Sequence, residues 1–470
     1  MLSSYTEAMR SQVDNTGLQS ATYDDYGVSL TTGFVPAKGT PALPASLPEY
    51  IWEIALQSAR NSQLAALSRL DHQGDASAAV ASCSSWRASI RQLPIIARPS
   101  KALLGNDALL RRAHVVLCML GHYYLHSLNN TSSVVVPTSI ALPWIHIADM
   151  LGVKPVLSYT SEILWNWTCP TQILPASDTI EISETFTGHE SEVAFDASSV
   201  KVELEGAPIL AAIHRTFSSH FRLADVTDLT RAITGELLLI EETVIRMRRH
   251  ISDLFSTCDP HHFYNVQRPW IAGSPPEGWT YDLGDDRNTV MHLRGSTAAA
   301  SPLLQSLDAF LGLDHTGEHR SFREDVREYM PRGHRSFIQA LSNISLNEVC
   351  SEEVRTQLEE VRSNSPVRAL VLALSAPCIN VEVDLAIDLQ NAYNAVLKAL
   401  TAFRTEHFKV VSLFVVSQAA KVKQLASTSK DDDTDTLQSD RVEGTGGSDL
   451  RILLNGYKKV TEQALFVAKT

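Results

Sequence analysis

The pattern of hydrophobic and polar positions predicts a chain that is helical over most of its length. From Leu229 to Ile251 apolar residues recur at steps of three and four, the spacing of one buried face of an α-helix. Residues 381–422 contain neither glycine nor proline and predict a long helix, and residues 448–469 predict an amphipathic one. The apolar run 113–125 is too short and too interrupted to span a bilayer, so we expect a buried helix there.

One short hairpin is the only β-structure that the pattern predicts. Residues 179–182 alternate polar and β-branched side chains with a period of two, which favours a hairpin within residues 173–186. We expect no strands beyond it. The predicted fold class is therefore mainly α.

These elements divide into an extension and two domains. Residues 1–45, with scattered glycine and proline, predict an N-terminal extension. Residues 46–187 predict a small, mostly helical domain that contains the hairpin, and residues 188–470 predict a large all-helical domain. Within the large domain, residues 427–447 are rich in Asp, Ser, Thr and Gly. Such a segment has too little apolar surface to be buried in a core, so we expect a mobile loop.

The composition of the chain limits the kinds of molecule that we expect it to bind. The chain has 470 residues, of which 44% are hydrophobic and 20% charged, as in ordinary globular proteins. Its 53 acidic and 40 basic residues give a net charge of −13, which repels nucleic acid and anionic lipid. Its six cysteines show no CxxC pairing, and the N-terminus resembles no secretory signal. We therefore expect a cytoplasmic monomer with a small-molecule substrate, and neither nucleic acid nor membrane as a partner.

His407 is the residue that points most directly to chemistry. Six apolar residues of the predicted helix fall on the same face as His407, so the imidazole lies inside an apolar stripe. Such a place suits heme, because one neutral nitrogen can bind iron while apolar side chains cover the porphyrin. A histidine satisfied within a protein core is the commoner outcome of this pattern. The apolar neighbours are Val396, Leu400, Phe403, Val410, Val411 and Phe414.

Two arginines suit the carboxylates of a flat ligand. Arg404 precedes His407 by three positions, so it can reach a heme propionate from the same face, unless it is simply solvated or salt-bridged. Residues 261–270 (HHFYNVQRPW) combine aromatic rings with Arg268, a mixture that can hold an aromatic ligand with a carboxylate. The alternative is an aromatic anchor that packs the end of a helix.

Other catalytic patterns do not fit. His261 with His262, and His122 with His126, lack a third ligand at zinc-like spacing. Residues 444–447 (GTGG) lack the third glycine of a dinucleotide-binding motif and follow a charged loop instead of a strand.

Five segments, in this order, resemble the indoleamine 2,3-dioxygenase family. The resemblance runs from about Leu142 to the C-terminus and is closest to fungal members. One such segment can arise by chance, whereas five in sequence do not. The segments are 142–144 (LPW) with 152–159 (GVKPVLSY), 262–269 (HFYNVQRP), 329–335 (YMPRGHR), 392–394 (AYN) leading to His407, and 444–450 (GTGGSDL).

The resemblance implies a role for each matching position. It implies that His407 is the proximal ligand of heme b, and that Arg404 and Asp308 form an ion pair beside a propionate. It implies that Phe263 contacts the indole, that Arg268 contacts the substrate carboxylate, and that the mobile loop closes over the substrate. The substrate-binding positions that follow are Phe195, Ser199, Phe263, Tyr264, Arg268, Ser296 and Thr445.

Some positions depart from the family pattern. Asp196 stands where a second apolar residue is usual, Tyr264 where phenylalanine is common, and residues 295–301 (GSTAAAS) where the family has more glycine and glutamine. An unpaired buried charge costs several kcal/mol. Asp196 therefore either points away from the pocket, or the local alignment is shifted by one residue.

The resemblance implies a heme-dependent dioxygenase. Its reaction inserts O2 into the indole C2=C3 bond of L-tryptophan and gives N-formyl-L-kynurenine, the first step of tryptophan catabolism towards NAD. Ferrous heme carries the chemistry, the protein orients the substrate and excludes water, and no side chain acts as a general base. Two alternatives stay open: a family member that acts on another indole derivative, and a heme-binding sensor without turnover. Arg268 and Thr445 favour an enzyme.

Overall fold

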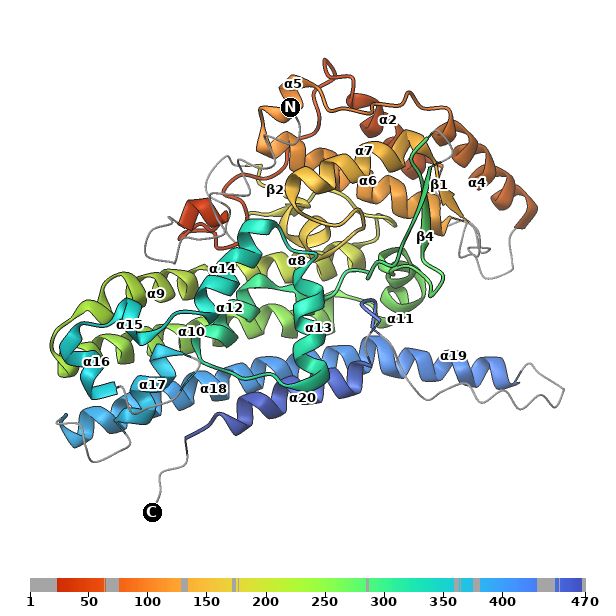
Figure 1. Ribbon diagram of the computed structural model, residues 1–470. Coiled ribbons are helices and arrows are strands. Elements are labelled where there is room, and N and C mark those ends of the chain that lie inside the picture. The colour runs from red at the N-terminus through yellow and green to blue at the C-terminus, as the bar shows by residue number, and fades with distance from the viewer. Residues whose placement is uncertain are drawn as a thin grey trace.

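The computed structural model is mainly α-helical, as predicted (Figure 1). Most of the expected loop 427–447 and residues 1–22 of the expected extension lie outside the described residues, and α19 continues to Thr428. The structure describes residues 23–62, 64, 76–127, 134–170, 175, 177–284, 287–358, 363, 365–374, 381–428, 444–447 and 449–466.

The N-terminal half is built around the buried helix α6 (Asp107–His126). Asn106 caps this helix, because its side chain accepts hydrogen bonds from the backbone N–H groups of its first turn. Gly121 lets the ring of Trp144, on α7 (Thr138–Leu151), lie directly against the α6 backbone. The other elements of this half are η1 (Tyr23–Tyr26), α2 (Tyr50–Asn61), α4 (Ala76–Arg91), α5 (Lys101–Leu104), β1 (Val135–Val136), η2 (Thr160–Leu164), β2 (Trp167–Thr168) and β3 (Glu181–Ile182).

The predicted hairpin is present in a smaller form. The strand within residues 179–182 is β3, and it pairs antiparallel with β2. That partner lies before residue 173, so the pairing spans a longer connection than the sequence pattern indicated.

A small sheet corrects the expectation that no strands follow residue 186. The strand β4 (Trp279–Asp282) pairs antiparallel with β5 (Asn288–Met291) and in parallel with β1, so the sheet joins the two halves of the chain (Figure 1). Trp279 and Tyr281 are buried and alternate with less buried residues. The strands are too short for this alternation to stand out from the helical pattern around it.

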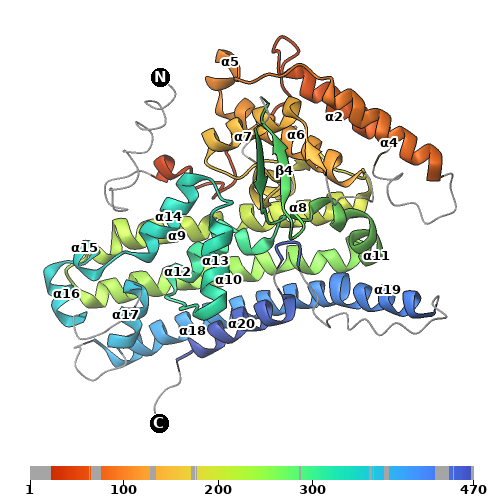
Figure 2. The same ribbon diagram turned by 45° about the vertical axis from the view of Figure 1, so that its right-hand side comes forward.

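The C-terminal half is carried by two long helices, α10 (Val226–Thr257) and α18 (Val383–Val411), which run side by side (Figures 1 and 2). The predicted stripe from Leu229 to Ile251 is buried along α10. Asp225 caps this helix by accepting from the N–H groups of Thr227 and Asp228.

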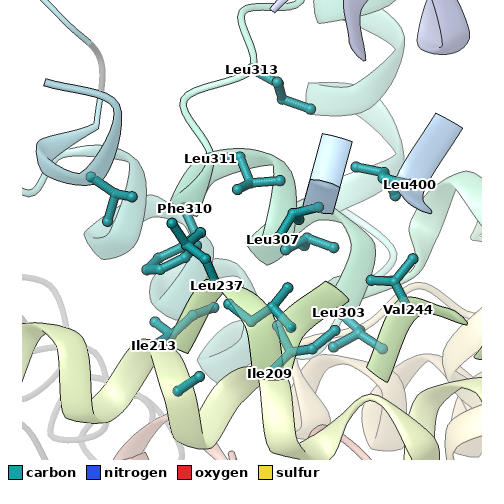
Figure 3. Packing of buried hydrophobic residues seen from close by; sticks show 14 of the residues in the cluster. Ile209, Ile213, Leu237, Val244, Leu303, Leu307, Phe310, Leu311, Leu313 and Leu400 are labelled. Carbon is teal, nitrogen blue, oxygen red and sulfur yellow. The ribbon is translucent and has the colours of Figure 1, made fainter. Parts of the chain in front are cut away.

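The core of this half lies where α10 meets α12 (Pro302–Phe310) and α9 (Ala207–Ser218). Figure 3 shows the side chains of Leu303 and Leu307 directed towards Leu237 and Val244 of α10. The other elements of this half are α8 (Glu190–Glu205), η3 (His220–Arg222), α11 (Pro260–His262), η4 (Phe263–Gln267), η5 (Arg268–Ile271), η6 (Ala298–Ala300), α13 (Gly317–Arg327), α14 (Arg332–Ser342), α15 (Leu346–Val349), α16 (Glu352–Leu358), α17 (Pro366–Ala373), η7 (Ser412–Val416), α19 (Ser417–Thr428) and α20 (Leu450–Gln463).

The buried apolar side chains form two clusters, one around α6 and α7 and one around α10, α12 and α18. The first cluster also contains Trp270 and Tyr281, which come from the C-terminal half of the chain. The second cluster contains Tyr26, which comes from the N-terminal half. The domain boundary near residue 187 therefore stays a prediction.

Two smaller expectations concern thiols and membranes. Cys83, Cys118, Cys169, Cys258 and Cys350 are free thiols, as the spacing predicted, and Cys378 lies outside the described residues. Of the helices that the structure describes, none combines the length and the apolar character needed to cross a bilayer.

Candidate functional site

A cavity lies where α10 and α18 meet α8 and the loops that follow α10. It encloses about 1580 Å³ of space free of protein atoms, part of which is open to solvent. Most of the predicted site residues line it, although they come from distant parts of the chain. The predicted residues on its walls are Phe195, Ser199, Phe263, Arg268, Ser296, Arg404, His407 and Thr445.

His407 lies on α18 with its ring on the wall of this cavity. Phe403 and Val410, which flank it on the same helix face, are buried and also line the wall. Burial lowers the pKa of the His407 imidazole to about 4, so the ring is neutral at pH 7. The described residues form no hydrogen bond with it, so a nitrogen lone pair is left for a ligand in the cavity.

Turns of π-helix bring several wall residues into place. The turn η7 follows α18 and presents Phe414 and Val415, while η2 presents Ile163 and η4 presents Phe263. A π-turn holds one residue more than an α-turn and so changes the face that the next side chains present. All three turns border the same cavity.

Asp308 organises the cations at one end of the cavity. Asp308 does not itself line the cavity. Its carboxylate oxygens bind Arg404 and Arg323, which line the cavity, and His315, which does not. Arg404 Nη2 lies 2.5 Å from Oδ1, and Arg323 Nη1 and His315 Nε2 lie 2.9 and 2.8 Å from Oδ2. Burial alone would raise the pKa of Asp308, but the charges of Arg404 and Arg323 outweigh it and hold that pKa well below its usual range. The expected Arg404–Asp308 pair is thus formed, with Arg323 as an additional member.

Arg268 lies at the start of η5, beside aromatic rings. Its guanidinium carbon is 5.4 Å from the centre of the Tyr264 ring, so Tyr264 contacts Arg268 and does not itself line the cavity. The Phe263 ring lies 4.4 Å from the Phe195 ring and 5.8 Å from the Phe414 ring, centre to centre. These rings form an aromatic wall next to a cation.

Residues 444–447 lie over the loop that contains Ser296. The Thr445 hydroxyl donates to the backbone oxygen of Ser296, and the N–H of Gly295 donates to the oxygen of Thr445 over 3.2 Å. Arg294 Nη1 donates to the oxygen of Gly446 over 2.6 Å. The described end of the expected mobile loop is therefore held at the cavity by several hydrogen bonds.

Asp196 follows the first of the two alternatives raised by the sequence. Its side chain is buried and does not line the cavity, and its Oδ1 accepts a 3.3 Å hydrogen bond from Gln267. Burial is the largest reason why its pKa is raised well above the usual value, and the charges of Glu162 and Glu192 add to the rise. Asp196 thus points away from the pocket.

Sequence reasoning missed two charged residues on the wall. Glu162 approaches from η2, and Arg323 approaches from α13. Glu162 stands within an apolar, aromatic stretch just after the matching segment 152–159, and this isolated charge was the signal that could have identified it. Arg323 lies on a strongly charged helix, where no pattern distinguishes it from solvated neighbours.

The residues around the cavity fit a heme group. A neutral imidazole with a free nitrogen, apolar and aromatic walls, and two largely buried arginines at one end match the iron, the porphyrin faces and the propionates. His122, in contrast, is satisfied within the core, because its two ring nitrogens bond to the oxygen of Trp270 and the N–H of Leu157.

Comparison with known proteins identifies the family. The model of the family described as Indoleamine 2,3-dioxygenase matches residues 22–464. Indoleamine 2,3-dioxygenase 1 of Rattus norvegicus is 28% identical over 392 residues, 81% of this chain and 84% of that protein. Indoleamine 2,3-dioxygenase of Saccharomyces cerevisiae is 28% identical over 338 residues, 67% of each chain.

A further relative carries a different substrate in its name. The 6-hydroxytryptophan 2,3-dioxygenase fscD of Fusarium equiseti is 26% identical over 438 residues, 90% of this chain and 93% of that protein. The family consists of heme-dependent dioxygenases of indole substrates. Because the family model spans nearly the whole sequence, the chain belongs to the indoleamine 2,3-dioxygenase family.

Proposed function

We propose that the chain binds heme b through His407 and cleaves the pyrrole ring of L-tryptophan or a closely related indole. The C2=C3 bond of the indole is cleaved and each of its two carbons receives one atom of O2. The product from L-tryptophan is N-formyl-L-kynurenine. The observation that carries the proposal is the presence, in one cavity, of the neutral His407 ring and the Arg268 guanidinium beside aromatic side chains. The names of the relatives, which carry indoleamine and 6-hydroxytryptophan, support an indole amine or a tryptophan derivative as the substrate.

Heme, when bound, supplies the iron that activates O2, in its ferrous state. The protein contributes binding and orientation. Arg268 binds the substrate carboxylate through its fork of N–H donors, while Phe195, Phe263 and Ser199 hold the ring. No side chain needs to remove a proton in this scheme.

The remaining predicted residues hold the two ligands in place. Arg404, kept in position by Asp308, meets a propionate, and Arg323 provides a second cation at the same end. Thr445 and Ser296 bring residues 444–447 over the substrate and exclude water. We further propose that the protein acts as a cytoplasmic monomer at the start of tryptophan catabolism towards NAD.

Reconstitution with hemin tests the cofactor. We expect a Soret band that shifts on reduction, and we expect His407→Ala to lose the band or change it, whereas His261→Ala, at an exposed position, keeps it. An unchanged spectrum in His407→Ala contradicts the proposal.

Arg268→Ala tests the substrate. Loss of a charge-assisted contact of about 2–3 kcal/mol raises KM for L-tryptophan roughly 30- to 150-fold. The KM for tryptamine, which lacks the carboxylate, changes little. An unchanged KM for L-tryptophan excludes this role of Arg268, and turnover of tryptamine but not of L-tryptophan by the unaltered protein indicates another indole as substrate.

A further inference from the structure

Glu162 is an acidic side chain on an otherwise mostly apolar stretch of the cavity wall. It lies on η2, its residue is only 5% exposed, and it stands between wall residues such as Tyr159 and Ile163. The aromatic ring of Phe195, which also lines the cavity, belongs to the neighbouring helix α8. The mechanism proposed above does not use this carboxyl group.

Three other buried carboxyl groups lie in the same part of the fold, and Oε2 of one of them, Glu203, has no hydrogen-bond partner among the described residues. Glu192, Glu203 and Asp196 stand off the cavity wall and accept hydrogen bonds from protein groups. For Glu162, the described residues provide one partner, Ser296. A carboxyl group has about four acceptor positions, so Glu162 keeps acceptor capacity towards the cavity. The partners of the other three are the N–H groups of Phe186 and Thr187 for Glu192, the hydroxyls of Tyr159 and Ser301 for Glu203, and Gln267 for Asp196.

The surroundings of Glu162 favour a neutral ligand group that donates a hydrogen bond. Burial raises the pKa of Glu162 to about 7, hydrogen bonding with Ser296 opposes this rise, and the charge of Glu192 adds to it. When an aromatic ligand displaces water from the cavity, the carboxyl group must find a partner on the ligand or stay unsatisfied. A plain hydrocarbon edge provides no such partner.

Resting on the function proposed above, we propose that Glu162 determines specificity by accepting a hydrogen bond from a hydroxyl group on the benzene ring of the indole. The preferred substrate class is then a ring-hydroxylated tryptophan. Glu162 belongs to a stretch of wall with Tyr159, Ile163 and Phe195, which suits the aromatic end of the ligand. The amino-acid end is served by Arg268, on a different element.

The experiment compares L-tryptophan with 5-hydroxy- and 6-hydroxy-L-tryptophan on the heme-loaded protein. We expect kcat/KM for at least one hydroxylated substrate to exceed that for L-tryptophan by about tenfold or more, because a site built for a hydroxyl group rejects the analogue that lacks it. In Glu162→Val this ratio falls to about one or below. Glu190→Gln, an exposed change in the first turn of α8, leaves the ratio unchanged.

Ligand binding provides a second readout, independent of turnover. The Kd from ligand-induced changes in the Soret band should show the same preference, and Glu162→Gln, which preserves shape, serves if Glu162→Val does not retain heme. If the preference for hydroxylated substrates over L-tryptophan is the same in the unaltered protein and in the Glu162 variants, the inference is overturned. The same holds if a variant weakens the binding of L-tryptophan and of its hydroxylated analogues equally. Absence of turnover with all three substrates, despite an intact Soret band and measurable ligand binding, overturns the proposed function instead and leaves the binding preference as the test of Glu162.

Discussion

Asp308 is the shared partner of two arginines and a histidine at the end of the cavity. In the described part of the chain, Arg404, Arg323 and His315 form their ion pairs with this carboxylate and with no other. All four side chains are mostly buried, so solvent screens their charges little. Removal of the one negative charge leaves like charges close together in a medium of low polarity.

Asp308→Asn is therefore expected to lower the free energy of unfolding by about 3–5 kcal/mol, the usual cost of breaking a buried ion pair from one side. Urea unfolding of the heme-loaded protein measures the effect. The control is Asp314→Asn, whose ion pair with Arg320 is about half exposed and contributes about 1 kcal/mol or less. Equal unfolding midpoints for the two variants contradict the central role of Asp308.

At the scale of secondary-structure elements, close approach of α6 and α7 depends on a single glycine. A Cβ atom at position 121 would overlap the fully buried ring of Trp144. The ring has no free space to retreat into within a well-packed cluster. Gly235 on α10 is the opposite case, since no atom lies within 4 Å of the place where its Cβ would stand.

Gly121→Ala and Gly235→Ala are thus expected to change stability in opposite directions. The first overpacks the α6–α7 contact and costs about 1–3 kcal/mol. The second removes backbone freedom from the unfolded chain and raises helix propensity, which stabilises the protein by about 0.5–1 kcal/mol. Thermal unfolding of both variants under one set of conditions measures the difference, and a loss of stability in both contradicts this account.

The sequence predicted the long elements of the fold and missed the short ones. Over α10 and α18 the helical spacing repeats many times, so the buried stripes and the face that carries His407 and Arg404 could be recognised. The strands β4 and β5 and the π-turns have four or five residues each, too few for a periodic pattern, and tertiary contacts determine them.

The candidate site was predictable to the extent that it follows local spacing or the family motifs. Spacing alone placed His407 and Arg404 together, the mixture of aromatic rings and one arginine in residues 261–270 pointed to Arg268, and the family motifs supplied Thr445. Glu162 and Arg323 reach the same cavity from η2 and α13, and their convergence depends on how the helices pack, which one sequence does not encode in any local pattern. Their convergence on one wall is therefore visible in the structure only, although the isolated charge of Glu162 in an apolar stretch was a local sign in the sequence.

At the scale of the whole molecule, residues 444–447 join the C-terminal helices to the loop after β5. Arg294 contributes to this connection beside the Thr445 hydroxyl, since it donates to the oxygen of Gly446 and also pairs with Asp325 over 2.5 Å. Residues 444–447 contribute Gly444 and Thr445 to the cavity wall. Loss of Arg294 therefore loosens a wall of the cavity without removing a group from it.

Arg294→Ala is expected to raise KM for the indole substrate up to about tenfold while the Soret band of the heme-loaded protein stays unchanged, because one charge-assisted hydrogen bond contributes about 1.5 kcal/mol. Steady-state kinetics and the visible spectrum measure both. Arg320→Ala, which removes an exposed arginine that is bonded to Asp314, serves as the control. A change in the spectrum with no change in KM contradicts this view of Arg294.

The hydrogen bonds between residues 444–447 and the loop beneath them also bear on the time for which a bound molecule stays enclosed. Each contributes about 0.5–1.5 kcal/mol, so together they make the detached arrangement roughly ten to a thousand times rarer than the attached one. On the function proposed above, we expect the product to leave only from that rarer arrangement. Release of the product then contributes to the turnover rate at saturating substrate.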